Sequence, residues 1–171
     1  MARWKRDMDW VSEAAQRIGC CGLAEWLLEF ASWAELTPTE CPPSGLAKKV
    51  DYASLSRGLK MTLLYPFAER AASADPQAWV LHDLEIDASR LPLPFDLNVS
   101  AETPRSTQRK LSADTAFGRS VDFRDGNYRV VHYLPDGRVV GVGFRPTLVG
   151  IESLHLQRIV TMPDFRTMGT P

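Results

Sequence analysis

The sequence predicts an α+β fold, in which an N-terminal helical hairpin precedes a mostly antiparallel β-sheet with one short helix. Two observations predict it. In the first 36 residues, apolar side chains recur every three or four positions, which is the period of an amphipathic helix. Between residues 121 and 144, they alternate with other side chains on both sides of the turn Leu134-Pro135-Asp136-Gly137, which is the period of a β-meander.

Residues 1–36 are expected to form the helical hairpin, with a break from Gly19 to Gly22. The apolar face of the first helix, within residues 4–18, consists of Trp4, Met8, Val11, Ala15 and Ile18. That of the second, within residues 23–36, consists of Leu23, Trp26, Leu27, Phe30 and Trp33. Four of the five tryptophans lie here, and we interpret them as packing anchors. The alternative is an aromatic surface for a partner.

Residues 37–50 begin with TPTECPPS, whose prolines predict a linker between the hairpin and a sheet domain at residues 51–161. Strands are expected at residues 58–65 and 78–86, and prolines predict an extended segment at residues 90–98. Thr103 and Pro104 suit the N-cap and first position of a short helix that ends near Leu111. After the meander we expect a strand or helix at residues 153–161 and a flexible tail at residues 162–171.

Charge and cysteine content narrow the function. Lys plus Arg number 20 against 21 Asp plus Glu, so no net field favours nucleic acid or an anionic membrane. No run approaches the roughly 20 apolar residues of a membrane span. The three cysteines, Cys20, Cys21 and Cys41, are an odd number and suit free thiols in a reducing compartment. Acidic residues near the N-terminus interrupt any apolar run of the length that a signal peptide needs. We therefore expect a cytoplasmic protein.

Motifs for chemistry are absent from the sequence. His82, His132 and His155 each lie in a strand-like run, without the ligand spacing of a metal site. A row of carboxylates on the strand at residues 78–86 and just beyond it could share a proton, but is more typical of a solvated or partner-facing edge. Arginines and aspartates are interleaved along the meander, a mixed pattern that suits a protein partner better than RNA. We expect no metal, no cofactor and no enzymatic activity.

Four segments between residues 51 and 144 follow one another as DYASLSRGLKMTLLY, AWVLHDLEI, LPLPFDLNVSAETPRSTQRKL and VDFRDGNYRVVHYLPDGRVVGVGF. In this layout the chain resembles bacterial immunity proteins encoded beside polymorphic toxins, including effectors of type VI secretion. The run from Leu93 to Leu97 corresponds to a Leu-Pro-Phe-Gly-Leu type segment of that family, with Asp96 in place of glycine. The run from Tyr133 to Gly137 corresponds to its Tyr-x-x-Asp-Gly type turn.

The resemblance implies a protein that binds and blocks a toxin domain made by the same cell, as a monomer or a 1:1 complex, without catalysis. A toxin that binds an anionic substrate would present a basic cleft. The candidate contacts are therefore charged residues at the end of the strand at residues 78–86 and in the loop around residues 122–125. They are Asp83, Glu85, Asp87, Asp122, Arg124 and Asp125. Two alternatives stay open. One is a small-ligand-binding protein or enzyme with a site assembled around His82 and His132, and the other is an effector chaperone or adaptor that uses the tryptophan-rich helices.

Overall fold

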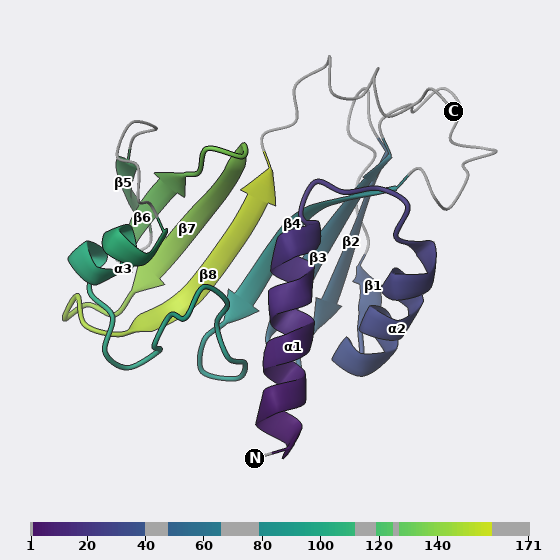
Figure 1. Ribbon diagram of the computed structural model, residues 1–171, viewed down its shortest axis with the longest axis horizontal. Coiled ribbons are helices and arrows are strands. Elements are labelled where there is room, and N and C mark those ends of the chain that lie inside the picture. The colour runs from purple at the N-terminus through teal and green to yellow at the C-terminus, as the bar shows by residue number, and fades with distance from the viewer. Residues whose placement is uncertain (1, 40–47, 66–78, 112–118, 125–126, 159–171) are drawn as a thin grey trace.

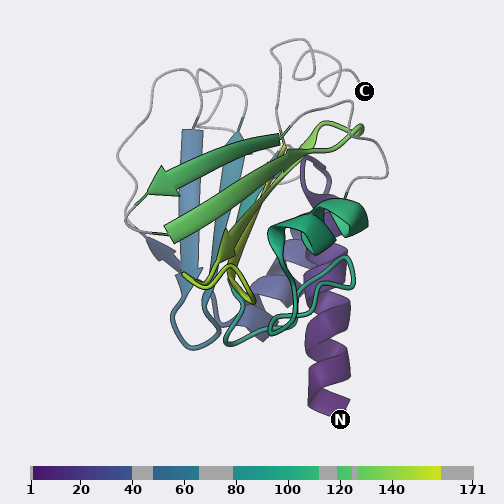
Figure 2. The ribbon, with the colours of Figure 1, turned by 90° about the vertical axis from the view of Figure 1, so that its left-hand side faces the viewer.

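The computed structural model describes residues 2–39, 48–65, 79–111, 119–124 and 127–158. Its elements are α1 (Ala2–Arg17), α2 (Ala24–Ala34), β1 (Thr37–Thr39), β2 (Lys48–Ser54), β3 (Leu59–Tyr65), β4 (Val80–Asp87), α3 (Pro104–Leu111), β5 (Arg119–Arg124), β6 (Asn127–Tyr133), β7 (Arg138–Phe144) and β8 (Ile151–Arg158). All strand pairs are antiparallel. The three helices lie on one side of the sheet (Figures 1 and 2). The predicted α+β fold is confirmed.

The eight strands form one sheet in the order β1-β2-β3-β4-β8-β7-β6-β5. Strand β8 is the last strand of the described residues, yet it lies between β4 and β7 (Figure 1). Leu156 of β8 is opposite Leu84 of β4 on one side and Val140 of β7 on the other. One strand therefore joins two consecutive sets, β1–β4 and β5–β7, into a single sheet.

The sheet face under the helices forms one hydrophobic core. Leu84, Val140 and Leu156 are fully or almost fully buried there. The helices contribute Val11, Ala14, Ala15, Ile18, Leu23, Trp26, Phe30 and Ala34 to the same cluster. Residues 1–36, which the sequence presented as a separate hairpin, therefore share their core with the sheet, because the apolar face of each helix needs the sheet as its cover.

An aromatic cluster joins α1 to α2. Trp10 and Trp33 stack with ring centroids 5.9 Å apart, and Trp26 stacks on Phe30 at 4.7 Å. The buried carboxylate of Asp7 accepts a hydrogen bond from Trp33 Nε1 at 3.1 Å. The interpretation of these three tryptophans as packing anchors is confirmed.

Asp7 also holds the turn between β2 and β3. Its Oδ1 lies 3.1 Å from Nη1 of Arg57, and both side chains are almost buried. The Arg57 guanidinium in turn lies over the ring of Trp33, with its carbon 4.7 Å from the ring centroid. One carboxylate thus connects both helices to the sheet.

Several predicted elements are confirmed closely. The hydroxyl of Thr103 accepts a hydrogen bond from the backbone N–H of Ser106 at 3.2 Å, so Thr103 caps α3 and Pro104 is its first residue. Strands β3 and β4 lie where two strands were expected. Residues 90–98 form no strand, but the chain turns at Phe95 and Asp96, whose φ angles are positive, so the segment is not extended throughout as predicted. The segment near the C-terminus is a strand rather than a helix.

One expectation was wrong. The stretch 37–50, predicted as a linker, contains β1 and the start of β2. Proline has no backbone N–H. Pro38 is tolerated because β1 is an edge strand, where the N–H groups on the outer side of the strand have no partner in the sheet. Strand β4 does not alternate strictly between the two faces, because its pairing with β3 shifts register and leaves His82 as an extra residue between Leu81 and Asp83. Leu81 therefore faces the core with Leu84.

Candidate functional site

The face of the sheet turned away from the helices is polar, and we call it the outer face. Strand register assigns to it the positions that alternate with the core positions. On the strands from β2 to β6 these positions include Asp51, Lys60, Thr62, Asp83, Glu85, Asp87, Ser153, His155, Gln157, Gly141, Gly143 and Arg129. The outer face is therefore the place in the described chain where polar groups from most of the strands converge.

Cross-strand pairs order one half of the outer face. Lys60 Nζ lies 3.2 Å from Oε2 of Glu85 on the neighbouring strand. The Thr62 hydroxyl donates to Oδ1 of Asp51 at 2.7 Å, and Lys49 Nζ lies 3.1 Å from Oδ2 of the same carboxylate. Exposed pairs of this kind contribute only about 0–1 kcal/mol each to stability. Their effect is to fix the positions of the charges.

A histidine–aspartate pair lies at the centre of the outer face. Nε2 of His155 on β8 is 2.6 Å from Oδ2 of Asp83 on β4, and each side chain is about a quarter exposed. His82 lies close enough for its charge to interact with both. Burial lowers the pKa of His82 below its ordinary value of 6.5, and Lys49 and His155 lower it further, against the opposing effect of Asp83.

The structure places the expected contact residues in two separate regions. Asp83 and Glu85 lie on the outer face of β4, and Asp87 ends that strand. Asp122 and Arg124 belong to β5 at the far edge, with β8, β7 and β6 between them and β4. The remaining residue, Asp125, lies outside the described residues.

Each of the three carboxylates on β4 already has a partner within the chain. Asp87 accepts hydrogen bonds from the backbone and hydroxyl of Ser89 and lies 3.3 Å from Arg90 Nε. Burial opposes its ionisation, but these hydrogen bonds and the arginine charge outweigh burial and lower the pKa of Asp87. Asp83 and Glu85 have the partners described above, His155 and Lys60.

The structure does not bring His82 and His132 together. His132 lies on β6, is 2% exposed and is paired with Val140 on the core side of the sheet. His82 lies on β4, three strands away. A site assembled around both side chains would need a different arrangement of strands.

Within the described residues, no three His, Cys, Asp or Glu side chains are grouped closely enough to hold a metal ion. Cys20 is half-buried and Cys21 exposed, both as free thiols, and Cys41 lies outside the described part of the chain. None of the described helices has the length and apolar character that crossing a membrane requires.

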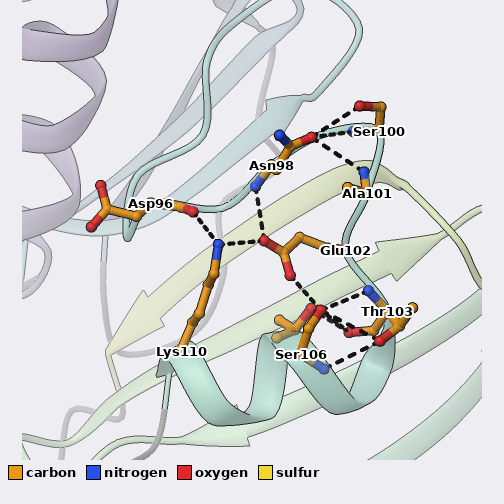
Figure 3. A network of polar contacts seen from close by, with 9 residues as sticks. Asp96, Asn98, Ser100, Ala101, Glu102, Thr103, Ser106 and Lys110 are labelled. Carbon is orange, nitrogen blue, oxygen red and sulfur yellow. Dashed lines mark hydrogen bonds and ion pairs between the residues drawn. The ribbon is translucent and has the colours of Figure 1, made fainter.

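A buried carboxylate organises the loop before α3 (Figure 3). The side chain of Glu102 is 4% exposed. Its Oε1 accepts hydrogen bonds from Nζ of Lys110 at 2.6 Å and from the backbone N–H of Asn98 at 3.0 Å, and its Oε2 accepts one from the hydroxyl of Ser106. Lys110 also donates to the backbone oxygen of Asp96 at 2.6 Å. Glu102 therefore fastens the loop to two successive turns of α3.

The electrostatics of Glu102 agree with this structural role. Burial opposes its ionisation, but the hydrogen bonds from Lys110, Ser106 and Asn98 outweigh burial and lower the pKa of Glu102. Phe95 and Asp96, within the loop, both have positive φ, at 63° and 54°. This conformation is unfavourable for non-glycine residues, so the network offsets a local cost. Sequence reasoning missed Glu102, although its spacing of four and eight residues from Ser106 and Lys110 is helical.

An apolar cavity of about 520 Å³ opens between α2 and the strands β2 and β3. Its lining includes Leu27, Leu28, Tyr52, Met61 and Trp79. Leu28, at the rim of this cavity, is 75% exposed.

Comparisons with known proteins found no match. No protein-family model, no curated protein and no solved structure is similar to this chain.

Proposed function

We propose that this chain is a non-catalytic binding protein that neutralises a toxin domain made by the same cell, and that it binds the toxin through the outer face. The observation that carries the proposal is the mixed-charge order of that face. Glu85 is held by Lys60, Asp51 by Lys49 and Asp83 by His155, so charged groups of both signs have fixed positions on the strands. Such patterns select a complementary protein surface and fix its register.

The outer face is large enough for this task. Neighbouring strands lie about 4.8 Å apart and rise about 3.3 Å per residue, so eight strands of mostly six to eight residues span roughly 34 by 23 Å. A stable complex buries about 800 Å² on each partner. One sheet face of this size supplies that area without contributions from the helices.

Ordered charges also lower the cost of binding. Long side chains lose rotamer freedom at an interface, at about 0.5–1.5 kcal/mol for each one immobilised. On the outer face, Lys60, Glu85 and Asp51 already have cross-strand partners before a toxin arrives. A partner then displaces or extends these pairs with a smaller entropic loss.

The toxin as the partner class rests on the resemblance in layout over about residues 51–145, and the expected cytoplasmic location of the chain implies a toxin that acts in the cytoplasm. Among the expected contacts, Asp83 and Glu85 are at the centre of the outer face. Asp122 and Arg124 would extend the interface to the edge strand β5. These contacts span the sheet from β4 to β5, and a partner that buries the full area given above also covers β1–β3.

The test is co-purification of the tagged chain with the product of the adjacent upstream gene, together with rescue of cells from that product. We expect a stoichiometric complex and protection from toxicity. The variant Glu85→Lys should weaken the complex at least tenfold, because it reverses an exposed charge at the centre of the face. The matched control is Glu29→Lys, an exposed charge reversal on α2. Absence of a complex, or equal affinity for both variants, would contradict the proposal.

The adaptor alternative needs a different variant. Removal of residues 1–36 would unfold the protein, since these residues share the core of the sheet. The substitution Leu28→Glu instead changes an exposed side chain of α2. An adaptor that used the helices would lose its partner in this variant, whereas the proposed function predicts full binding.

A further inference from the structure

The outer face has a trough along β7, between β6 and β8. Gly141 and Gly143 both occupy outer-face positions there, alternating with the buried Val140 and Val142. Neither glycine residue has the positive φ that would explain it by backbone conformation. The two glycines therefore have a packing reason.

Side chains from the neighbouring strands fill the space above these glycines. A Cβ on Gly141 would stand 2.7 Å from Nε and 2.8 Å from Nη2 of Arg129, which belongs to β6. A Cβ on Gly143 would stand 2.5 Å from Oγ of Ser153, which belongs to β8. The glycines thus let a guanidinium and a hydroxyl lie over the backbone of β7 from opposite sides.

Arg129 differs from the other charged groups of the outer face. Asp51, Asp83, Glu85 and Asp87 each have a partner within the chain. Arg129 is half-buried, and among the described residues it forms no hydrogen bond or ion pair. A guanidinium has five N–H donors in a planar fork and stays charged at any physiological pH. A half-buried fork of donors without an acceptor is suited to an oxyanion.

We propose that Arg129 and Ser153, above Gly141 and Gly143, form a subsite for one carboxylate, an aspartate or glutamate side chain of the protein partner. The assignment of this carboxylate to a protein rests on the proposed function. A guanidinium binds a carboxylate through two parallel hydrogen bonds, and the Ser153 hydroxyl, over Gly143, is a further donor two residues along the same strand.

A nucleic acid is the wrong source for this anion. A nucleic acid duplex carries a negative charge about every 1.7 Å, so a strand bound at Arg129 would also cross the adjacent strands. There it would meet Glu85 and Asp87 on β4, one strand beyond Ser153 and His155 of β8. A single carboxylate avoids this repulsion, because it ends at the trough.

The test titrates the ¹⁵N-labelled full chain with the peptide acetyl-Gly-Glu-Gly-amide and follows the Arg129 Nε–H and the Gly141 and Gly143 amides by NMR. We expect saturable shifts confined to β6, β7 and β8, and no saturation with the glutamine analogue of the peptide. Arg129→Gln should raise the dissociation constant at least tenfold, and the exposed control Arg105→Gln should not change it.

Two further variants examine the geometry. Gly141→Ala keeps the arginine but places a methyl group where its guanidinium stands, so binding should fall as in Arg129→Gln. Asp122→Asn removes the carboxylate at the position opposite Arg129 in β5, and binding should be unchanged or tighter. Equal binding by Arg129→Gln and wild type, full binding by Gly141→Ala, or loss in Asp122→Asn would overturn the proposal. Tighter binding of inorganic phosphate than of the peptide would overturn the choice of a carboxylate.

These outcomes are separate from those of the proposed function. The peptide titration needs no toxin, so it tests the subsite independently of any protein partner. If the peptide binds and no toxic partner is recovered, the proposed function fails and the subsite remains. If a toxin binds equally well to wild type and Arg129→Gln and the peptide does not bind, the subsite fails and the proposed function remains.

Discussion

The two faces of the sheet are built from the same strands but have opposite chemistry. Under the helices, Leu84, Val140 and Leu156 line up across neighbouring strands and exclude water. An adjacent residue of each of these strands lies on the outer face. There, Glu85, His155 and Gly141 are neighbours across β4, β8 and β7. The period of two thus separates stability from recognition: substitutions on one face should change folding, and those on the other should change binding.

The largest effect is expected where α2 meets the sheet. Phe30 is completely buried, and Phe30→Ala should lower the free energy of unfolding by about 3–5 kcal/mol, because it leaves a cavity in the core. Leu28→Ala, on the same helix but 75% exposed, should change it by less than about 0.5 kcal/mol. Urea unfolding measures both. Similar losses in the two variants would contradict the assignment of Phe30 to the core.

A smaller effect is expected at the buried carboxylate of Glu102, also on the helix side of the sheet. Glu102→Gln should cost about 1–3 kcal/mol at pH 7, because Lys110 loses its charged partner. The pKa of Glu102 is lowered in the folded state, so its contribution is present above its ordinary value of 4.5 and is lost as pH falls through the folded pKa. Between pH 7 and pH 3, urea unfolding should therefore show a smaller decrease in the free energy of unfolding for the variant than for the wild type. An unchanged acid loss would contradict this account.

The smallest effect is expected at His82, where β4 bulges. The folded protein holds the pKa of His82 below 6.5, so the unfolded chain binds the proton more readily and stability falls as pH decreases from 6.5 towards the folded pKa. His82→Leu removes the proton uptake of this histidine, so the free energy of unfolding should depend less on pH. The change should be less than about 1 kcal/mol because the ring is only partly buried. Thermal unfolding at pH 7.5 and pH 5 measures it. A steeper pH dependence of stability in the variant would contradict the lowered pKa of His82.

Local patterns explain how much of the fold was predictable. The Thr103-Pro104 pair predicts the start of α3, and Pro135 with Gly137 predicts the turn between β6 and β7, because each acts through its own backbone geometry. Neither depends on distant residues. Such signals predict helices, turns and the meander correctly.

The missed features depend on partners far away in the chain. Strand β2 has few apolar residues and is a strand because β3 pairs with it, and β1 exists because β2 pairs with it. The bulge at His82 is visible only in the register between β3 and β4. Sequence reasoning identified the carboxylates of β4, but it could not predict that Lys60 and His155 would lie opposite Glu85.

The same limit applies to the trough. Gly141 and Gly143 are visible in the sequence as glycines within a strand, but only the structure identifies Arg129 and Ser153 as the groups that lie over them. That assignment needs the order of β6, β7 and β8, which no local pattern contains.

The position of β8 has a consequence for synthesis of the protein. On the ribosome, β4 and β7 both emerge before the strand that lies between them. Until Ile151–Arg158 is made, each has an edge of unpaired backbone groups, and apolar side chains such as Leu84 and Val140 lack their cover. The sheet is therefore completed in one late step, and a nascent chain that stalls before this strand is exposed to aggregation and to the chaperones that prevent it.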